Sequence, residues 1–138
     1  MIVGKVSNIA VLFTDLVGST ELSVSVSPDA ADQLRREHFA VLRRAVAAAD
    51  GTEIKNLGDG LMVMFPTASA ALACAVGMQQ ATEMDNRGRT SRFGLRVGLS
   101  AGEAVEEDGD YFGDPVIEAA RLCARCDPGQ VLATEVVR

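Results

Sequence analysis

Short apolar runs alternate along this chain with longer segments whose apolar positions recur at helical spacing. The run Ile9–Phe13 is apolar throughout and predicts a strand buried on both faces, followed by a polar loop. Ser27 and Pro28 form a helix start, with serine as N-cap and proline at the first helical position. Asp50 and Gly51 end this helix, and the glycine can adopt a left-handed cap. The positions that share its apolar face are Leu34, His38, Val41, Leu42, Ala45, Val46 and Ala49.

The same alternation continues along the chain and indicates the fold class. Predicted next are strands over 52–57 and 61–65, a helix over 66–84, strand segments over 93–100 and 101–105, a helix over 114–126 and a strand over 130–133. Gly58-Asp59-Gly60 is a tight turn that joins the first two of these strands into a hairpin. Glu106–Asp110 is an acidic turn, and Asp114 before Pro115 is typical of a helix N-cap. This order predicts one α+β domain, a ferredoxin-like split βαβ sandwich with helices packed on a mostly antiparallel, palm-like sheet.

Composition excludes some classes of partner. The 138 residues carry a net charge of −6 and no basic stripe interleaved with aromatics, which argues against nucleic-acid binding. An anionic nucleotide can still bind such a chain if metal ions mediate the contact. No apolar run approaches the roughly 20 residues of a membrane span, and the N-terminus lacks the layout of a signal peptide. We therefore expect a cytoplasmic protein with no membrane segment in this chain.

The three cysteines form no disulfide framework, which is typical of a reducing compartment. Cys123 and Cys126 form a lone C-x-x-C without a second pair or nearby histidines. Two small apolar residues on one helix face are therefore favoured over a zinc site. His38 lies on an apolar helix stripe, so packing is favoured over catalysis for this residue.

Two aspartates stand out because each follows or adjoins a strongly apolar strand. Asp15 lies at the C-terminal end of the first strand, and Asp59 lies in the hairpin turn. In a split βαβ sheet these segments are neighbours, so the two carboxylates can converge and hold two divalent ions. The small residues Gly18, Ser19 and Thr20 would let backbone N–H groups close around phosphates. Turn chemistry for Asp59 and a capping role for Asp15 remain open as simpler readings.

Four segments carry a resemblance to a known family. They are Phe13–Thr20, Lys55–Gly60, Leu95–Gly102 and Asp110–Val116. In this order they resemble the class III adenylate and guanylate cyclase homology domain, of the bacterial adenylate cyclase type, over nearly the whole chain. The resemblance implies that residues 1–138 form a single such domain. Because the family normally continues beyond the position of Arg138 into further strands, it also implies that the domain is truncated at its C-terminus.

The resemblance implies metal and phosphate roles for the residues that match its motifs. Asp15 and Asp59 match the two metal-binding aspartates, and the backbone carbonyl of Leu16 is an expected further ligand for two Mg²⁺ or Mn²⁺ ions. Arg96 matches an arginine that contacts the triphosphate. Phe13 and the Gly18-Ser19-Thr20 segment belong to the motif expected to contact the substrate.

The resemblance also implies how the base is read and how the transition state is stabilised. Lys55 and Asp110 match the pair that reads adenine, since lysine offers a donor for N1 and aspartate accepts from the exocyclic amine. Arg121 matches the catalytic arginine that stabilises charge on the phosphate. In the family, these three residues act on a nucleotide held by the aspartates of the partner subunit, so we expect a homodimer with composite sites. The sequence pattern alone is also consistent with Lys55 as a solvated strand residue, Asp110 as a turn residue and Arg121 as a surface charge.

The sequence departs from the family at one functional position. Ile117 stands where the family usually has an asparagine that orients the ribose, four residues before Arg121. The leading expectation is an adenylate cyclase that forms cyclic AMP and pyrophosphate from ATP. The alternatives are a catalytically weak or inactive nucleotide-binding and dimerisation module, and a guanylate cyclase. A diguanylate cyclase is disfavoured because the chain has no Gly-Gly-Asp-Glu-Phe-type run.

Overall fold

The computed structural model describes residues 4–18, 27–87 and 93–134 and has an α+β fold, as the sequence predicts. Its elements are β1 (Lys5–Val17), α2 (Pro28–Ala48), β2 (Thr52–Asn56), β3 (Leu61–Phe65), α3 (Ala68–Asn86), β4 (Gly94–Glu107), β5 (Asp110–Phe112), α4 (Asp114–Arg125) and β6 (Val131–Ala133). The strands form one sheet in the order β2-β3-β1-β4-β5, and β6 pairs parallel to β4. All other pairings are antiparallel. Since α2 links β1 to β2 and β3 lies between these strands, the predicted split βαβ arrangement is present.

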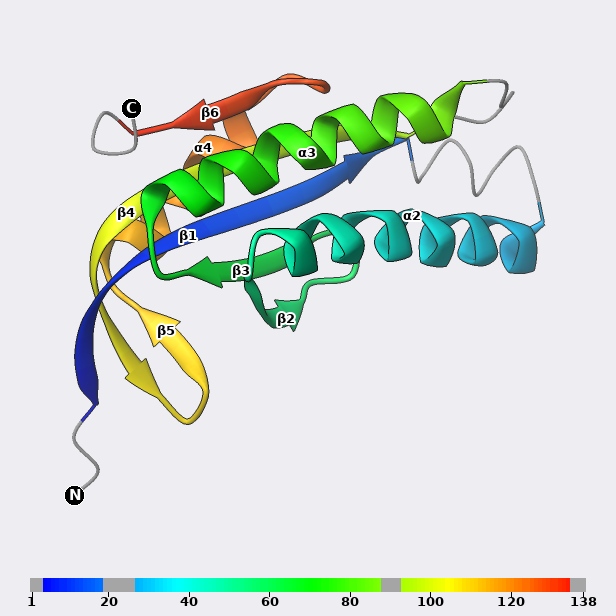
Figure 1. Ribbon diagram of the computed structural model, residues 1–138. Helices are drawn as coiled ribbons and strands as arrows, with labels where there is room; N and C mark the ends of the chain where they lie inside the picture. Colours follow the sequence, from blue (N-terminus) through cyan, green and yellow to red (C-terminus); the bar gives the residue numbers. More distant parts are fainter. Residues whose placement is uncertain (1–3, 19–26, 88–92, 135–138) are drawn as a thin grey trace.

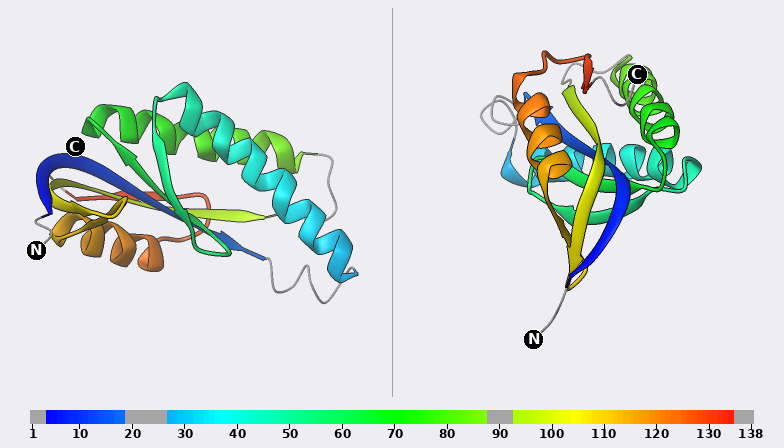
Figure 2. Two further views of the ribbon diagram at one scale, coloured as in Figure 1. Left: turned by 90° about the horizontal axis from the view of Figure 1, so that it is seen from below. Right: turned by 90° about the vertical axis from the view of Figure 1, so that its left-hand side faces the viewer.

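Helices cover both faces of the sheet. Figures 1 and 2 show α2 and α3 on one face and α4 on the opposite face, with β1 running through the middle. Leu12 of β1 packs in the core under α2 and α3, whereas Val11 and Phe13 pack in the core under α4. Burial on both sides explains why this strand is apolar without alternation.

The first strand is longer than its apolar run predicts. The polar residues Thr14 and Asp15 belong to β1 because they pair with Val97 and Arg96 of β4, which agrees with the expected place of Asp15 at the C-terminal end of the strand. The predicted break between strand segments 93–100 and 101–105 is wrong. β4 is continuous because β1 pairs with it from Gly94 to Glu106.

The acidic turn is shorter than predicted. Asp108 and Gly109, both with positive φ (51° and 80°), make the turn between β4 and β5. Asp110 is therefore the first residue of a strand rather than part of the turn. A two-residue turn with positive φ at both positions matches the twist of the strands it joins.

Two helix caps differ from the sequence-based expectation. At the end of α2, Asp50 takes the left-handed conformation (φ 55°), while Gly51 is needed because a Cβ would lie 2.6 Å from the Phe65 ring. At the start of α4, Gly113 is the N-cap and Asp114 is the first helical residue, with no side-chain cap bond. The N-cap predicted for α2 is confirmed, because the Ser27 hydroxyl accepts a hydrogen bond from the Ala30 N–H at 3.2 Å.

The remaining sequence-based expectations concern buried groups. His38 is buried and its ring lies 5.3 Å from that of Phe93, in agreement with a packing role. All three cysteines are buried as free thiols. Within the described ranges, no helix combines the length and apolar character needed to cross a membrane.

Candidate functional site

The hairpin turn between β2 and β3 is bound to the C-terminal end of β1. The Thr14 hydroxyl accepts a hydrogen bond from the Leu61 N–H at 3.0 Å, and the Asp59 carbonyl accepts one from the Leu16 N–H at 2.8 Å. Gly60 allows this contact, because a Cβ there would lie 1.8 Å from the Thr14 carbonyl oxygen. The turn therefore holds Asp59 beside the strand end that carries Asp15.

Both aspartates line one pocket of 390 Å³ at this end of the sheet. The pocket is open to solvent at the carboxylates, since the Asp15 and Asp59 side chains are 33% and 52% exposed. Three small residues of α4 also line it. Its full lining is Phe13, Thr14, Asp15, Leu57, Asp59, Gly60, Arg96, Ala120, Cys123 and Ala124.

An arginine lies against each carboxylate. Arg96, on β4 opposite Asp15, forms an ion pair with it and also donates to the Ala124 carbonyl at 3.3 Å. The hydrogen bond to Asp15 raises the pKa of Arg96 above its ordinary value. Arg35 of α2 approaches Asp59, with 3.6 Å between its Nε and Oδ1. The sequence did not single out Arg35, because nothing in the periodicity of α2 indicates which turn its side chain reaches.

The donor set suits a hard divalent cation. Asp15 and Asp59 offer carboxylate oxygens, and Mg²⁺ in proteins is commonly bound by one or two carboxylates together with substrate phosphates and water. No cluster of three or more His, Cys, Asp or Glu side chains suited to a metal exists among the described residues. Ions at this site would therefore need oxygens from a phosphate or the backbone, such as the Leu16 carbonyl. The residues present fit Mg²⁺ or Mn²⁺ bound together with a nucleotide.

Lys55 and Asp110 form an ion pair with 2.8 Å between Nζ and Oδ2, although they lie on β2 and β5 at opposite ends of the strand order. The hydrogen bond from Lys55 is the main cause that lowers the pKa of the Asp110 carboxyl, and the Tyr111 N–H adds to the effect. Asp110 is therefore an ionised acceptor at neutral pH. Neither residue lines the pocket that contains Asp15 and Asp59.

Comparison with known proteins identifies the family. A family model of the adenylate and guanylate cyclase catalytic domain matches residues 1–138. The chain belongs to this family. The fold agrees: a crystal structure described as an adenylate/guanylate cyclase/hydrolase from Silicibacter pomeroyi superimposes with a TM-score of 0.80 at 36% identity, covering 96% of this chain and 78% of that one.

Two curated relatives of this cyclase domain are longer proteins. A Rhizobium meliloti protein named putative adenylate cyclase 3 is 36% identical over 128 residues, which span 91% of this chain and 22% of that protein. A Mycobacterium tuberculosis protein named as a pH-sensitive adenylate cyclase is 34% identical over 130 residues, spanning 94% of this chain and 32% of that protein. The chain thus covers less than a third of the length of either relative.

The exposed face of α4 in the cyclase domain carries Ile117 and Arg121. Ile117 is 55% exposed, and Arg121 is exposed with no ion-pair partner within the described part of the chain. On the inner face, burial raises the pKa of the Cys123 thiol to about 12, so it remains protonated. The Cys126 thiol lies 3.1 Å from the Gln130 carbonyl. Both cysteines are thus packing residues, as the sequence favoured.

Two predicted phosphate contacts, Ser19 and Thr20, lie outside the described residues. Gly18 directly follows β1 and has a φ of 101°, a conformation that glycine adopts at low cost. The role of this segment toward phosphate stays a prediction.

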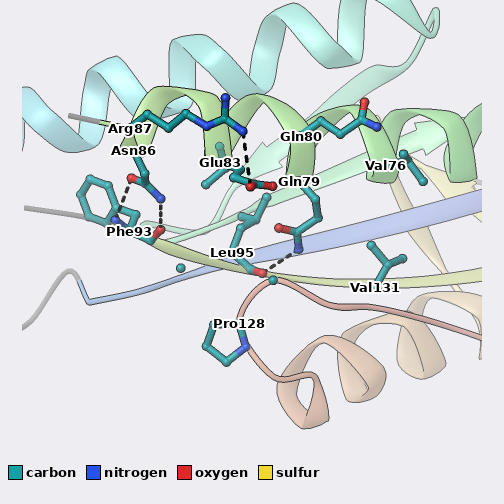
Figure 3. Close-up of a pocket in the computed structure, with 13 residues that line it drawn as sticks. Val76, Gln79, Gln80, Glu83, Asn86, Arg87, Phe93, Leu95, Pro128 and Val131 are labelled. Carbon is teal, nitrogen blue, oxygen red and sulfur yellow. Dashed lines mark hydrogen bonds and ion pairs between the residues drawn. The ribbon is translucent and has the colours of Figure 1, made fainter. Parts of the chain in front are cut away.

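A larger pocket of 710 Å³ lies between α3, the start of β4 and the segment before β6 (Figure 3). Gln79 crosses it and donates to the Leu95 carbonyl at 2.7 Å. Its lining carries one carboxylate, that of Glu83, which faces Arg87 at 3.7 Å. Of these two pockets, therefore, the smaller one is lined by a pair of carboxylates.

Proposed function

We propose that this cyclase domain is an adenylate cyclase that converts ATP to 3′,5′-cyclic AMP and pyrophosphate. The observation that carries the proposal is the docking of the β2–β3 turn onto β1, which brings Asp15 and Asp59 to one open pocket. The relatives from Rhizobium meliloti and Mycobacterium tuberculosis are named as adenylate cyclases, which supports the same activity.

The reaction joins the ribose 3′-oxygen to the α-phosphorus and breaks the bond from that phosphorus to the pyrophosphate oxygen. Two divalent ions, held by Asp15, Asp59 and the Leu16 carbonyl, would polarise the phosphate and lower the pKa of the 3′-hydroxyl. Arg96 lies at the same pocket and would turn from Asp15 toward the triphosphate. Arg121 would supply positive charge to the phosphate oxygens as negative charge develops there.

Lys55 and Asp110 support ATP rather than GTP as substrate. Lys55 can donate to adenine N1, and the ionised Asp110 can only accept, which suits the exocyclic amine of adenine. Guanine carries a carbonyl where adenine has this amine, and that carbonyl would face the Asp110 carboxylate. The guanine carbonyl and the Asp110 carboxylate are both acceptors, so they would face each other without a hydrogen bond and disfavour GTP.

A homodimer would complete the site. The proposed metal residues and the base readers do not share a pocket within one chain. Leu57 at the pocket and Phe112 and Ile117 near the start of α4 are each more than half exposed, which favours burial against a second copy. In such a dimer, Lys55, Asp110 and Arg121 of one subunit would act on a nucleotide bound by the aspartates of the other.

A second candidate is a nucleotide-binding and dimerisation module with weak or no turnover. Ile117 favours it, because an exposed isoleucine offers no hydrogen bond to a ribose. One lost transition-state hydrogen bond can cost on the order of 10- to 1000-fold in rate.

The test is a turnover assay on purified protein with ATP or GTP and Mn²⁺ or Mg²⁺, reading cyclic AMP and cyclic GMP. We expect metal-dependent cyclic AMP formation, and we expect Asp15→Ala to abolish it while circular dichroism shows an unchanged fold. Tight ATP binding without product would favour the second candidate. Unchanged turnover in Asp15→Ala would contradict the mechanism.

A further inference from the structure

An arginine faces each of the two proposed metal carboxylates, and one of these arginines has no role in the function proposed above. Arg96 pairs with Asp15. Arg35 approaches Asp59 from α2, on the face of the sheet opposite α4 (Figure 2). It lies outside the four segments that resemble the cyclase motifs and does not line the 390 Å³ pocket. Its place beside Asp59 therefore needs an explanation of its own.

The contact between Arg35 and Asp59 is electrostatic rather than a formed hydrogen bond. At 3.6 Å, the Nε–Oδ1 separation exceeds hydrogen-bond length. The Arg35 Nε is buried and has no hydrogen-bond partner among the described residues, while a terminal nitrogen lies 3.4 Å from Asp32. A buried donor without an acceptor costs free energy and marks a place where an acceptor can be gained. The Arg35 guanidinium thus keeps a free donor next to a proposed metal ligand.

We propose that Arg35 is a gating cation that couples divalent-metal binding to nucleotide binding. In the nucleotide-free domain, its charge faces Asp59 and opposes a metal ion at that carboxylate. When the metal arrives with a nucleotide, the Arg35 guanidinium turns out of its buried position toward the pocket and donates its Nε–H to a phosphate oxygen, which relieves the opposition. This inference rests on the proposed function, since it requires Asp59 to be a metal ligand.

The size of the effect follows from Coulomb's law. A unit charge about 6 Å from a divalent ion in a water-like medium weakens the binding of that ion by about tenfold. The half-exposed Asp59 justifies the water-like medium. Because salt screens exposed charges, the effect should shrink as ionic strength rises.

The test is calorimetric titration of the full chain with Mn²⁺, with and without a non-cyclisable ATP analogue, at low and high salt. Arg35→Met removes the charge and keeps the length of the side chain. We expect it to bind Mn²⁺ alone about tenfold more tightly than the unmodified chain at low salt, with a smaller difference at high salt. The gain in Mn²⁺ affinity caused by the analogue should be smaller in Arg35→Met. Arg35→Lys keeps the charge and should behave like the unmodified chain.

Arg36→Met is the matched control. Arg36 is the next residue on α2, is 68% exposed and pairs with Asp32 but not with Asp59. Its loss should leave Mn²⁺ binding and the effect of the analogue unchanged. A thermal melt of each variant checks that α2 stays folded.

The outcomes separate this inference from the proposed function. Equal or weaker Mn²⁺ binding by Arg35→Met, including no measurable binding by either protein, would overturn the gating role. If Asp59→Asn abolishes Mn²⁺ binding but Arg35→Met leaves it unchanged, only the gating role fails. If Asp59→Asn binds Mn²⁺ as well as the unmodified chain, the metal site itself is wrong and both proposals fail.

Discussion

Gly60 lies closer to the backbone of β1 than any residue with a side chain could. A Cβ at this position would meet the Thr14 carbonyl oxygen at 1.8 Å, and that oxygen belongs to a central strand that cannot move aside. This close approach allows two hydrogen bonds. The Thr14 hydroxyl accepts one from the Leu61 N–H, and the Asp59 carbonyl accepts one from the Leu16 N–H. One glycine thus sets the position of Asp59.

We expect Gly60→Ala to lose metal-dependent activity and about 1–3 kcal/mol of unfolding free energy, because the turn must separate from β1. Urea denaturation and a cyclase assay measure the two effects. Gly77→Ala is the control: Gly77 lies inside α3 with open space around it, so alanine should stabilise the helix by roughly 0.5–1 kcal/mol. A Gly60→Ala protein with normal stability and turnover would show that the docked turn is not required.

At the scale of elements, an ion pair links the strands at the two ends of the order β2-β3-β1-β4-β5. Lys55 on β2 and Asp110 on β5 are brought together only because the β4–β5 hairpin reaches across from the far edge (Figure 1). Both side chains are partly exposed, at 45% and 29%. Exposed ion pairs add little to the free energy of unfolding. A role in recognising the nucleotide base therefore explains this pair better than a role in folding does.

We expect the double substitution Lys55→Glu with Asp110→Ala to shift the ratio of ATP to GTP turnover toward GTP by about tenfold or more, because both proposed hydrogen bonds to adenine would be lost. The unfolding free energy should change by less than about 1 kcal/mol. Paired assays with the two nucleotides measure the ratio. An unchanged ratio would remove the base-reading role from these residues.

The surface of α2 that packs on α3 and Phe93 contains a group sensitive to pH. Burial lowers the pKa of His38 from 6.5 to about 4, although the charge of Asp85 acts in the opposite direction. The native state therefore keeps His38 neutral in a range where the unfolded chain takes up a proton. The neutral, buried His38 contributes its full stabilisation to the native state above pH 6.5. This stabilisation is lost as the pH falls toward 4, and the unfolding free energy decreases by about 3 kcal/mol in total.

Urea denaturation from pH 7 to pH 4 should show this loss in the unmodified chain, and His38→Leu should show a loss smaller by about 3 kcal/mol. The variant removes the titrating group and places an apolar side chain of similar size beside Phe39 and Phe93. Parallel pH profiles of the two proteins would contradict the assignment.

At the scale of the whole molecule, the residues of the proposed site lie in two places. Asp15 and Asp59 line the pocket beside α4, whereas Lys55, Asp110 and Arg121 lie outside it. Two copies would bring both sets onto one nucleotide, and a closed two-fold dimer would form two such sites.

This arrangement predicts complementation between inactive variants. Asp15→Ala and Arg121→Ala should each be inactive alone, but a mixture should recover about a quarter of normal activity, because half of randomly formed dimers carry one intact site of two. Unfolding and refolding the mixture before the assay ensures exchange. A mixture that stays inactive would argue for sites built within one chain.

The sequence by itself determined the order of the elements and indicated the candidate residues of the site. The unbroken apolar run Ile9–Phe13 indicated a doubly covered strand, and Ser27 marked the start of α2, because burial and capping act on neighbouring residues. The family motifs indicated Asp15 and Asp59 before any geometry was known. These are local signals, and each is readable from a few adjacent positions.

The tertiary structure decided what depends on distances between remote segments. Nothing local distinguishes Gly60 from an ordinary turn glycine, places Asp110 on a strand, or directs Arg35 toward Asp59. β1 extends over Thr14 and Asp15 because β4 pairs with them, against their polar character. Contacts of this kind arise from the packing of whole elements, so only the folded chain shows that each carboxylate lies against an arginine.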